Sequence, residues 1–402
     1  MNRWSVPMLR QAAALLGAGA LALVAACGGG GSSTAPTGTP GATPSSFSQG
    51  PISGFGSVIV NGVRWDDSSA TVTDDDGVSH DRSALKLGMV VSVDGSSVDH
   101  ASGSGHAVAF QFGSETLGPI TSIDATASTM VVLGLTAEVT TSTVFDSSIT
   151  GGLAGLAAGD VVEIFGLFDA ANNRVVATRV EKKTGVTEYR LRGTVAGLDS
   201  TGKTFTLGGE TIAYGSASNV PATLANGVQV KVKLQTTQVG GAWVANKVRL
   251  ILREAEDRSD AEVEGVISAW TSATSFEVNG LVVDATNASF PEGSTGVVLG
   301  AHVEIKGAGT NGVLVATVVH VEGDDHHGGG GQPKEFELHG AISNVDSVKM
   351  TFALRGLTVS YAGSVGFEHG SAAGLVNGAK VEVKGTLSAD LTIIDATRIK
   401  FE

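Results

Sequence analysis

The most regular feature of the chain is an alternation of apolar and polar residues that recurs five times. Each copy reads Gly-x-x-Val-x-[Val/Ile], and in the third copy Val228, Val230 and Val232 alternate with polar residues. Because successive side chains of a strand point to opposite faces, the alternation predicts a strand with one buried and one solvated face. The leading glycines, about seventy residues apart, are Gly88, Gly159, Gly227, Gly300 and Gly378.

A period of this length is typical of one small β-domain. Asn-Gly pairs at Asn61 and Asn279 indicate hairpins, and the copies open with Gly-x-[Ile/Val] and close with Ala-x-x-[apolar]. Five or six strands in so few residues favour a closed barrel, which also removes exposed strand edges. We therefore expect an all-β chain, a tandem array of five small closed barrels of the oligonucleotide/oligosaccharide-binding type. The expected repeats are 51–113 (the most divergent), 114–183, 187–253, 261–322 and 335–402.

The N-terminus has the pattern of an export signal. Arg3 and Arg10 precede an apolar run from Ala12 to Ala26 that is shorter than the roughly 20 residues of a membrane span. The small residues before Cys27 resemble the lipobox of bacterial lipoproteins. The resemblance implies a signal peptide at 1–26, cleavage between Ala26 and Cys27, and lipidation of Cys27. The alternative is an ordinary secretory signal with a cysteine near its cleavage site.

The segment that follows, 27–50, is rich in Gly, Ser, Thr and Pro. Such a composition cannot bury a core, so we expect a disordered tether. Gly28 stands directly after the cysteine, and in the lipoprotein sorting pattern a residue other than Asp there favours the outer membrane of a Gram-negative bacterium. The expected membrane contact is made through the N-terminal lipid alone.

Composition narrows the classes of partner. The chain contains 56 glycines and 5 % aromatic residues, which suits short strands and tight turns, and its net charge is −14. An acidic chain repels phosphate backbones, so we expect no nucleic-acid partner. Envelope proteins or polysaccharides remain as candidate partners. Cys27 is the single cysteine, which excludes a disulfide within the chain.

One stretch satisfies the phosphate-loop pattern G-x-x-x-x-G-K-[S/T]. It contains Gly197, Gly202, Lys203 and Thr204. Phosphate binding by this motif needs a helix after the loop, whereas Thr204 opens a strand-like run. We interpret the match as a chance occurrence in a hairpin turn.

Two acidic stretches have the residue types of metal sites. A cluster in the predicted linker 323–334 and just before it offers imidazole and carboxylate groups, namely His320, Asp324, Asp325, His326 and His327. We expect a solvated linker here, with a weak zinc or nickel site as the alternative. The run from Asp74 to Gly77 lacks an oxygen ligand at Val72 that a calcium loop would need, so it predicts an Asp-Gly hairpin turn. We expect neither a bound metal nor a cofactor.

Candidate groups for hydrolysis or sugar binding are few. His100, Ser102, Ser104 and His106 lie in one segment without a G-x-S-x-G elbow, which favours a polar loop. The tryptophans that could stack on sugars stand at non-equivalent positions of the repeats, which favours roles in barrel cores or ends. These tryptophans are Trp65, Trp243 and Trp270.

Taken over about 350 residues, the repeated pattern behind a lipobox resembles the bacterial domain of unknown function 5666 family. The resemblance implies an architecture and a location but no catalytic residues. Five copies without a shared polar constellation favour spacing or avidity over chemistry. We therefore expect a non-catalytic, lipid-anchored cell-envelope protein whose modules form a structural, adhesive or partner-binding scaffold. The alternative is a periplasmic or surface lipoprotein that binds glycans or small ligands.

Overall fold

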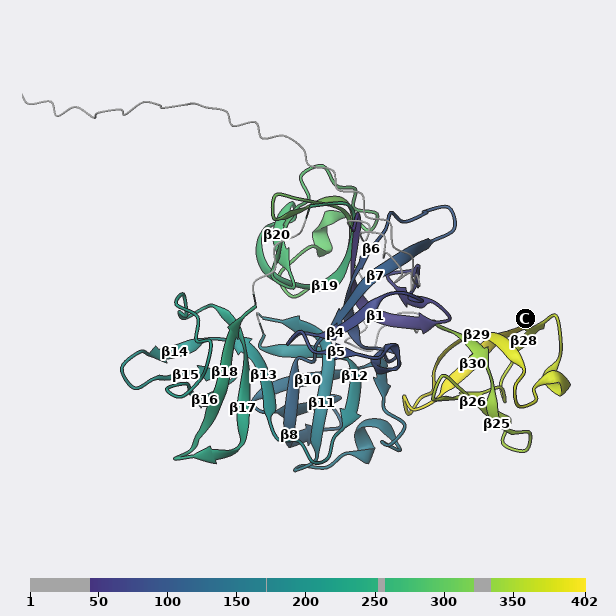
Figure 1. Cartoon of the computed structure of the whole chain (residues 1–402), viewed down its shortest axis with the longest axis horizontal. Helices are drawn as coiled ribbons and strands as arrows, with labels where there is room; N and C mark the ends of the chain where they lie inside the picture. Colours follow the sequence, from purple (N-terminus) through teal and green to yellow (C-terminus); the bar gives the residue numbers. More distant parts are fainter. Residues whose placement is uncertain (1–43, 171, 252–256, 322–333) are drawn as a thin grey trace, which may run out of the picture. The chain divides into compact units, whose positions relative to one another are not determined.

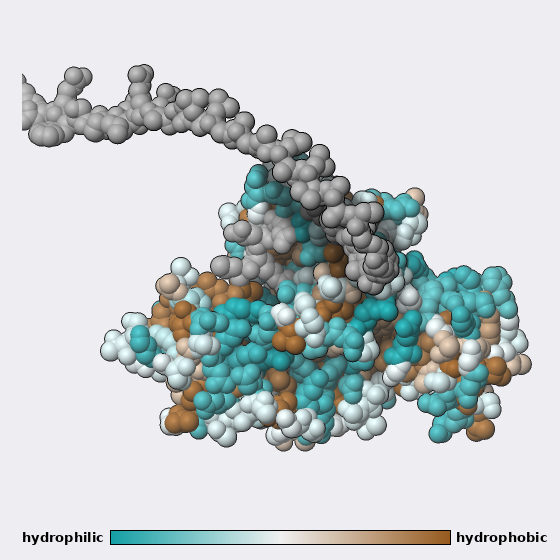
Figure 2. All heavy atoms as spheres, in the orientation of Figure 1, coloured by the Kyte–Doolittle hydropathy of each residue, from teal (hydrophilic) through white to brown (hydrophobic). Residues whose placement is uncertain are grey.

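The structure, a computed structural model, describes residues 44–170, 172–251, 257–321 and 334–402. Their regular structure is almost entirely β-strand, with four 3-10 turns and, within these ranges, no helix long and apolar enough to span a membrane. The predicted signal peptide, Ala26, Cys27 and most of the predicted 323–334 linker lie outside the described residues. Hydrophilic residues cover much of the face seen in Figure 2, with apolar residues scattered among them.

Repeat 3 shows the topology that the five repeats share (Figure 1). Its first strand is interrupted, so that β13 pairs with β17 and β14 pairs with β15. The strand β16 then pairs with β15 and, in parallel, with β18, and β18 pairs with β17, which closes the barrel. The strands are β13 (Tyr189–Thr194), β14 (Ala196–Asp199), β15 (Thr204–Leu207), β16 (Glu210–Ala213), β17 (Gln229–Val239) and β18 (Ala242–Leu250).

The other four repeats close in the same order, first strand to second, third, fifth, fourth and back to the first. Repeat 2 consists of β8 (Thr116–Asp124), β9 (Thr129–Val132), β10 (Leu135–Phe145), η2 (Gly152–Gly155), β11 (Val161–Asp169) and β12 (Arg174–Lys182). Repeat 4 consists of β19 (Arg258–Ser272), β20 (Ser275–Val278), β21 (Leu281–Asp284), η3 (Ser294–Gly296), β22 (His302–Thr310) and β23 (Val313–Val321). The prediction of five small closed barrels is confirmed.

Repeats 1 and 5 add short strands to this plan. Repeat 5 consists of β24 (Phe336–Ala341), β25 (Ser343–Asp346), β26 (Thr351–Leu354), β27 (Leu357–Ser360), β28 (Gly366–Glu368), η4 (Ala372–Gly374), β29 (Lys380–Leu387) and β30 (Ile394–Phe401). Repeat 1 consists of β1 (Ser46–Phe55), β2 (Val58–Val60), β3 (Val63–Asp66), the hairpin β4 (Thr71–Asp74) and β5 (Ser79–His80), η1 (Arg82–Ala84), β6 (Val90–Gly95) and β7 (Ser104–Phe112). The β4–β5 hairpin is an insertion without a counterpart among the described strands of the other repeats.

The strand β1 begins earlier than the sequence pattern indicated. Ser46, Ser48 and Gln49 are buried in β1, although they fall within the predicted 27–50 tether. The start of the strand was not predicted because its residues are polar, and their burial depends on contact with a neighbouring repeat. In the same way β19 begins at Arg258, three residues before the predicted start of repeat 4 at Ala261.

The repeated motif has a backbone reason. All five leading glycines have a left-handed φ, between 82° for Gly88 and 92° for Gly159. A side chain at such a φ brings Cβ against the following carbonyl oxygen, which glycine avoids. The valines that follow in β17, Val230 and Val232, are fully buried. The motif therefore marks a tight turn that feeds the fourth strand into the barrel.

The first strand of each repeat is bent, and its two halves pair with different partners inside the barrel. In β1, Ser46–Pro51 pair with β6, whereas Ile52 and Gly54 pair with β2. The first half therefore has one edge without a partner in its own barrel. These edges pair between repeats: β1 runs parallel to β19 and, further along, to β24, and β8 pairs with β13. Barrel closure thus leaves edges that the neighbouring repeats complete.

We predict that Gly378→Ala lowers the free energy of unfolding by about 1–2 kcal/mol, since alanine is strained in the left-handed region. Space is not the cause, because a Cβ at Gly378 meets no atom within 4 Å. The measurement is urea unfolding of the full chain. Gly363→Ala in the same repeat, equally open but without the left-handed φ, is the control and should change stability by less than about 0.5 kcal/mol. Equal effects of the two substitutions would contradict the explanation.

Candidate functional site: a polar cavity where four repeats meet

The inserted β4–β5 hairpin carries three consecutive aspartates at its turn. Asp74 Oδ1 accepts hydrogen bonds from the backbone N–H groups of Asp76, at 3.0 Å, and Val78, at 2.9 Å. Gly77 follows with a φ of 80°. The stretch therefore forms the Asp-Gly hairpin that the sequence predicts, and the carboxylates of Asp75 and Asp76 are left to act elsewhere.

These two carboxylates contact four cations on β17 and β18 of repeat 3. Asp75 Oδ2 lies 2.5 Å from Lys231 Nζ and 2.9 Å from Arg249 Nη2. The carboxylate of Asp76 lies 2.8 Å from Lys233 Nζ and 3.1 Å from Lys247 Nζ. Sequence alternation predicted this polar face of β17 to be solvated, but the side chain of Lys231 is only 12 % exposed. The hairpin of repeat 1 covers it, a contact that alternation within one repeat cannot reveal.

The cations stabilise the ionised carboxylates. Burial raises the pKa of Asp76, but the hydrogen bonds and charges of Lys233 and Lys247 outweigh burial and lower that pKa to about 2. For Asp75, burial is likewise outweighed, by Lys231 and Arg249, so its pKa is lowered. The ion pairs therefore contribute to docking of the hairpin above the ordinary carboxyl pKa and are lost as the pH falls toward 2.

A second buried ion pair joins repeats 2 and 3 nearby. Glu115 accepts two hydrogen bonds from Arg192 Nη1, at 2.9 and 3.1 Å, and both side chains are buried. The guanidinium also lies over the Phe168 ring, 4.5 Å from its centroid, and donates to Gln229 Oε1 at 3.0 Å. A buried charge needs such partners, so the pair fixes Arg192 at the boundary of these repeats.

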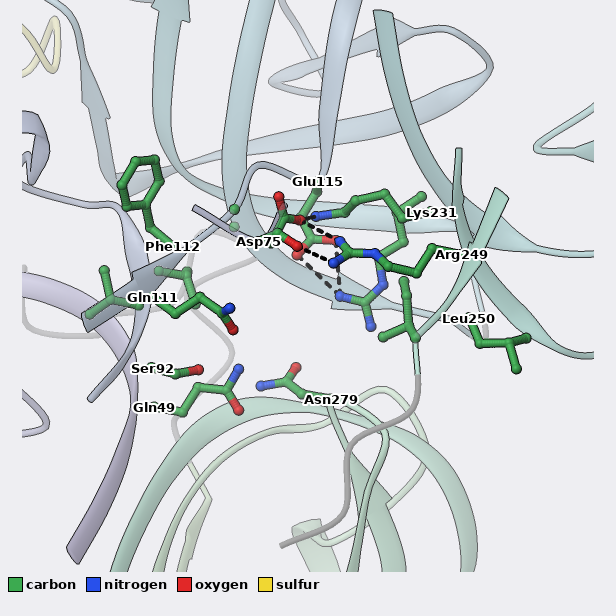
Figure 3. A pocket seen from close by; sticks show the side chains of 16 residues that line it. Gln49, Asp75, Ser92, Gln111, Phe112, Glu115, Lys231, Arg249, Leu250 and Asn279 are labelled. Carbon is green, nitrogen blue, oxygen red and sulfur yellow. Dashed lines mark hydrogen bonds and ion pairs between the residues drawn. The ribbon is translucent and has the colours of Figure 1, made fainter. Parts of the chain in front are cut away.

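Between these ion pairs and β1 lies a cavity of about 180 Å³ (Figure 3). Four repeats line it, and its polar groups fall into two sets. The charged set comprises Asp75, Glu115, Arg192, Lys231 and Arg249, and the neutral set comprises Gln49, Ser92, Gln111 and Asn279. Figure 3 shows the neutral groups gathered on the side opposite the ion pairs.

Two residues that line the cavity each have a buried polar atom without a hydrogen-bond partner among the described residues. The two atoms are Oε1 of Gln49, a residue 2 % exposed, and Nε of Arg192, a residue 5 % exposed. Buried polar atoms are rarely left unpaired, because an unmade hydrogen bond costs about 1–3 kcal/mol. Because each of these atoms exposes less than 1 Å², neither is offered to the cavity, which we name the four-repeat cavity.

The phosphate-loop pattern lies in a hairpin turn between β14 and β15. Asp199 Oδ1 accepts from the N–H groups of Thr201 and Gly202, at 2.9 and 2.8 Å, and Lys203 has a φ of 55°. Thr204 opens β15 rather than a helix. The backbone amides are thus used within the turn, and Gly197 lies in β14 before it.

Of the predicted metal-ligating cluster, the structure describes His320, whose Nδ1 lies 3.1 Å from Glu292 Oε1. Asp324, Asp325, His326 and His327 lie outside the described residues. A different trio, Glu337, His339 and Glu382, places its ligand atoms within 4.8 Å of one another. Cations already contact both carboxylates: Arg64 and Lys384 at Glu337, and Arg398 and Lys400 at Glu382. A metal would have to displace them, so this trio is an ion-pair network.

The structure also assembles a serine, a histidine and an aspartate that the sequence analysis did not combine. His106 Nε2 lies 3.1 Å from Ser69 Oγ, and His106 Nδ1 lies 3.3 Å from Asp66 Oδ2. The order of contacts matches a nucleophile, base and acid. However, the side chains of His106 and Asp66 are 49 % and 57 % exposed, so the group lies open to solvent and does not enclose an acyl substrate.

The remaining predicted candidates have structural partners. Ser102 and Ser104 share a hydrogen bond in the β6–β7 loop, and His100 contacts Asp260 of repeat 4. Trp65 is buried in the core of repeat 1. Trp243 donates to Glu210 Oε2 at 2.9 Å, and Trp270, which is 46 % exposed, donates to the carbonyl oxygen of Val297 at 2.8 Å.

Comparison with known proteins defines the class. Family models match residues 49–102, 118–181, 192–249, 264–320 and 339–400, which together exceed half of the chain. The chain belongs to the family described as Domain of unknown function (DUF5666), and it carries five tandem copies of that domain. The predicted family resemblance is thereby confirmed.

The other comparisons add little. No curated protein matches the chain significantly. A solved structure described as "drosophila Unr CSD456" is similar at 15 % identity over 42 % of this chain and 78 % of that one, with a TM-score of 0.16. A TM-score this low supports no conclusion about this chain.

We predict that the Asp76 carboxyl titrates with a pKa of about 2. The lowered value means that the folded protein loses stability as the pH falls from about 4 to 2, because the unfolded chain takes up the proton first. NMR titration of the side-chain carboxyl carbon measures the value directly. Lys247→Ala should raise it, while Lys349→Ala, which removes a cation from repeat 5, should not. An Asp76 pKa near 4 in the folded chain would contradict the docking of the β4–β5 hairpin on repeat 3.

Proposed function

We propose that the chain is a non-catalytic, lipid-anchored protein of the cell envelope whose five barrels act as one structural or partner-binding scaffold. The observation that supports the proposal is the use of repeat 1 as a shared partner. Its strand β1 pairs with β19 and β24, and its β4–β5 hairpin makes ion pairs with repeat 3. Modules held in this way present their surfaces in one fixed arrangement.

Further ion pairs support this reading. Arg64 of repeat 1 contacts Glu337 of repeat 5, and Arg258 of repeat 4 lies 3.1 Å from Asp94 of repeat 1. Their partners come from different barrels, so their charges stabilise the assembly rather than any single barrel. If the barrels did not contact one another, these side chains would be in water, where isolated ion pairs contribute little to stability.

The lipid anchor rests on the sequence around Cys27. Covalent acyl chains stabilise membrane association by about 0.8 kcal/mol for each buried CH₂ group. A tether before Ser46 would separate the barrels from the bilayer. We propose the outer membrane of a Gram-negative bacterium as the compartment, because the residue after the cysteine is Gly28 and not an aspartate.

A second candidate function, binding of a small ligand, is favoured by a specific observation. The four-repeat cavity is lined by the neutral polar residues Gln49, Ser92, Gln111 and Asn279 beside its ion pairs. Binding sites characteristically place a few convergent polar groups in a concave space. The scaffold and the ligand site are compatible, because the cavity exists only while the repeats are docked.

We predict that Asp75→Ala/Asp76→Ala accelerates amide hydrogen exchange in β17 and β18 at least about tenfold, since four cations lose their carboxylate partners in repeat 1. Hydrogen-exchange mass spectrometry of the full chain measures the effect, and exchange in β29 and β30 should be unchanged. Asp346→Ala is the matched control, because Asp346 also lies at a hairpin turn but bonds only within repeat 5. Unchanged hydrogen exchange in repeat 3 would contradict the proposal that the barrels act as one scaffold.

We predict that cells expressing the chain incorporate radiolabelled palmitate into it, and that Cys27→Ser abolishes both the label and membrane fractionation. Ser32→Ala, a neighbouring substitution that keeps the thiol, should change neither. Globomycin, which blocks lipoprotein signal peptidase, should cause an unprocessed form to accumulate. Label in the Cys27→Ser protein would exclude this cysteine as the anchor.

A further inference from the structure

We propose that a second cavity, between repeats 1, 2 and 5, binds a phosphate monoester that belongs either to a free small molecule or to a membrane lipid. The proposal goes beyond the proposed functions, because neither of them involves this cavity. It is supported by the excess of positive charge on the cavity wall, and by how the five repeats differ at the positions that carry this charge.

The cavity is large enough for a small organic phosphate. It measures about 690 Å³. Repeat 1 lines it with the turn before Gly88, repeat 2 with Asp146, Ser147 and Arg179, and repeat 5 with the turn between β26 and β27. Sites for small ligands typically measure about 300–1,000 Å³, so the space suits a phosphate together with an organic group of the size of a sugar.

Positive charge exceeds negative charge on the cavity wall. Four basic side chains and two carboxylates line the cavity, although the whole chain has 26 basic and 40 acidic residues. The two carboxylates already have partners. Asp67 lies 3.5 Å from Arg82, and Asp146 lies 3.1 Å from Arg179. The other two cations, Lys86 and Arg355, form no ion pair with a described residue, so an anion can pair with them without breaking an existing contact.

Arg355 occupies a turn position at which two other repeats have asparagine. Asn61, Asn279 and Arg355 have left-handed φ values of 50°, 53° and 52°. Each side chain donates to a carbonyl oxygen of the first strand of its repeat, and Arg355 does so through Nε, to His339 at 2.8 Å. The Nη groups of Arg355 are not needed for this hydrogen bond and donate to no described residue. Such a guanidinium can donate two parallel hydrogen bonds to phosphate oxygens.

Lys86 likewise adds a charge that the fold does not require. Its exposed side chain lies between Leu85 and Leu87, which are 4 % and 2 % exposed and hold the backbone in place. The other repeats have uncharged residues at the same position, two residues before the leading glycine, namely Ala157, Ala225, Val298 and Val376. The repeats therefore act as internal controls, and they show that both free cations are additions to the common structural plan.

A phosphate monoester matches this set of donors. Near neutral pH it carries about 1.5 to 2 negative charges and three acceptor oxygens. Ser57, Ser83 and Ser147 line the same cavity, and their hydroxyls form no hydrogen bond with a described residue, so they can donate to these oxygens. A carboxylate has a single charge and would leave one cation unpaired. The net charge of −14 repels a long polyanion, whereas a single phosphate contacts the cavity only.

Titration calorimetry of the full chain tests the proposal. The probes are inorganic phosphate and glucose 6-phosphate, with glucose as the neutral counterpart and glucuronate as the carboxylate counterpart. We expect glucose 6-phosphate to bind, glucuronate to bind at least about tenfold more weakly, and glucose to give no heat. Binding should weaken as sodium chloride is added, because salt screens the attraction between the phosphate and exposed cations.

Two variants introduce residues that other repeats have at these positions. Arg355→Asn and Lys86→Ala should each weaken the binding of glucose 6-phosphate about tenfold. Since asparagine and alanine occur at these positions in other repeats, we expect both variants to fold, and if thermal unfolding shows that one is destabilised, the other decides. Lys349→Ala removes a cation of repeat 5 that does not line the cavity, and it should leave the affinity unchanged.

Vesicles distinguish the two sources of the phosphate. Phosphatidic acid carries a phosphate monoester and phosphatidylglycerol a diester, and each is mixed into phosphatidylcholine vesicles. The protein is the full-length Cys27→Ser variant, which lacks the proposed lipid. Preference for phosphatidic acid assigns a lipid ligand, whereas binding of glucose 6-phosphate with equal binding to both kinds of vesicle, or to neither, assigns a soluble one.

Three results would overturn the proposal. They are no binding of inorganic phosphate, glucose 6-phosphate or phosphatidic acid; affinity for glucuronate equal to that for glucose 6-phosphate; and full affinity in folded Arg355→Asn or Lys86→Ala. The scaffold proposal is tested separately, because the residues that line this cavity belong to repeats 1, 2 and 5. Faster exchange in Asp75→Ala/Asp76→Ala without phosphate binding by the unaltered chain rejects this site and retains the scaffold.

Discussion

The arrangement of the five repeats depends on the bent first strand of each barrel. Within a barrel, one half of this strand pairs with the fourth strand and the other half with the second. The first half therefore presents backbone N–H and C=O groups along one edge, and such groups are costly when they are buried without partners. Pairing β1 with β19 and β8 with β13 satisfies them. A local consequence of barrel geometry thus becomes the main contact between repeats.

Electrostatics then selects which repeats meet. The chain is acidic overall, yet Lys231, Lys233, Lys247 and Arg249 gather on one face of repeat 3. Four cations in one area repel one another, and a hydrophobic neighbour could not cover them. The β4–β5 hairpin supplies two carboxylates at the spacing of adjacent residues, and each carboxylate contacts two cations. Specific docking of repeat 1 on repeat 3 follows from this pairing of charge, while the strand edges alone would not discriminate among repeats.

The sequence was sufficient for features that are local to one repeat. The left-handed turn at Gly378, the alternation of Val230 and Val232, and the Asp-Gly turn of the hairpin all follow from period and backbone chemistry. Features shared between repeats were not predictable in the same way. Ser46 and Ser48 look like tether residues, because the strand that buries them lies more than two hundred positions away in the sequence.

The residues of the candidate site show the same difference between features local to one repeat and features shared between repeats. Trp65 was expected in a core or at a barrel end and is buried, since a large aromatic in a chain poor in aromatics is needed to fill a barrel. Gln49 gave no signal, because one glutamine in a polar segment resembles any other. Asn61 gave a partial signal: its Asn-Gly pair indicates a hairpin, but its side-chain amide also donates to the carbonyl oxygens of Gln49 and Glu262, at 3.0 and 3.2 Å. A turn residue thereby fastens β1 to repeat 4.

These shared contacts constrain the first repeat from outside its own barrel. The expectation that its opening departs from the common motif is wrong, because Gly50-Pro51-Ile52 occupies the positions that Gly118-Pro119-Ile120 has in repeat 2. Gly54 lies further along β1, and a Cβ there would lie 2.3 Å from the carbonyl oxygen of Glu337 in repeat 5. At Gly88 the corresponding atom would lie 2.4 Å from the carbonyl oxygen of Thr178 in repeat 2. Backbones approach this closely only where side chains are absent. Repeat 1 therefore keeps the motif that all five repeats share, while glycines on its surface let the backbones of repeats 2 and 5 approach it closely.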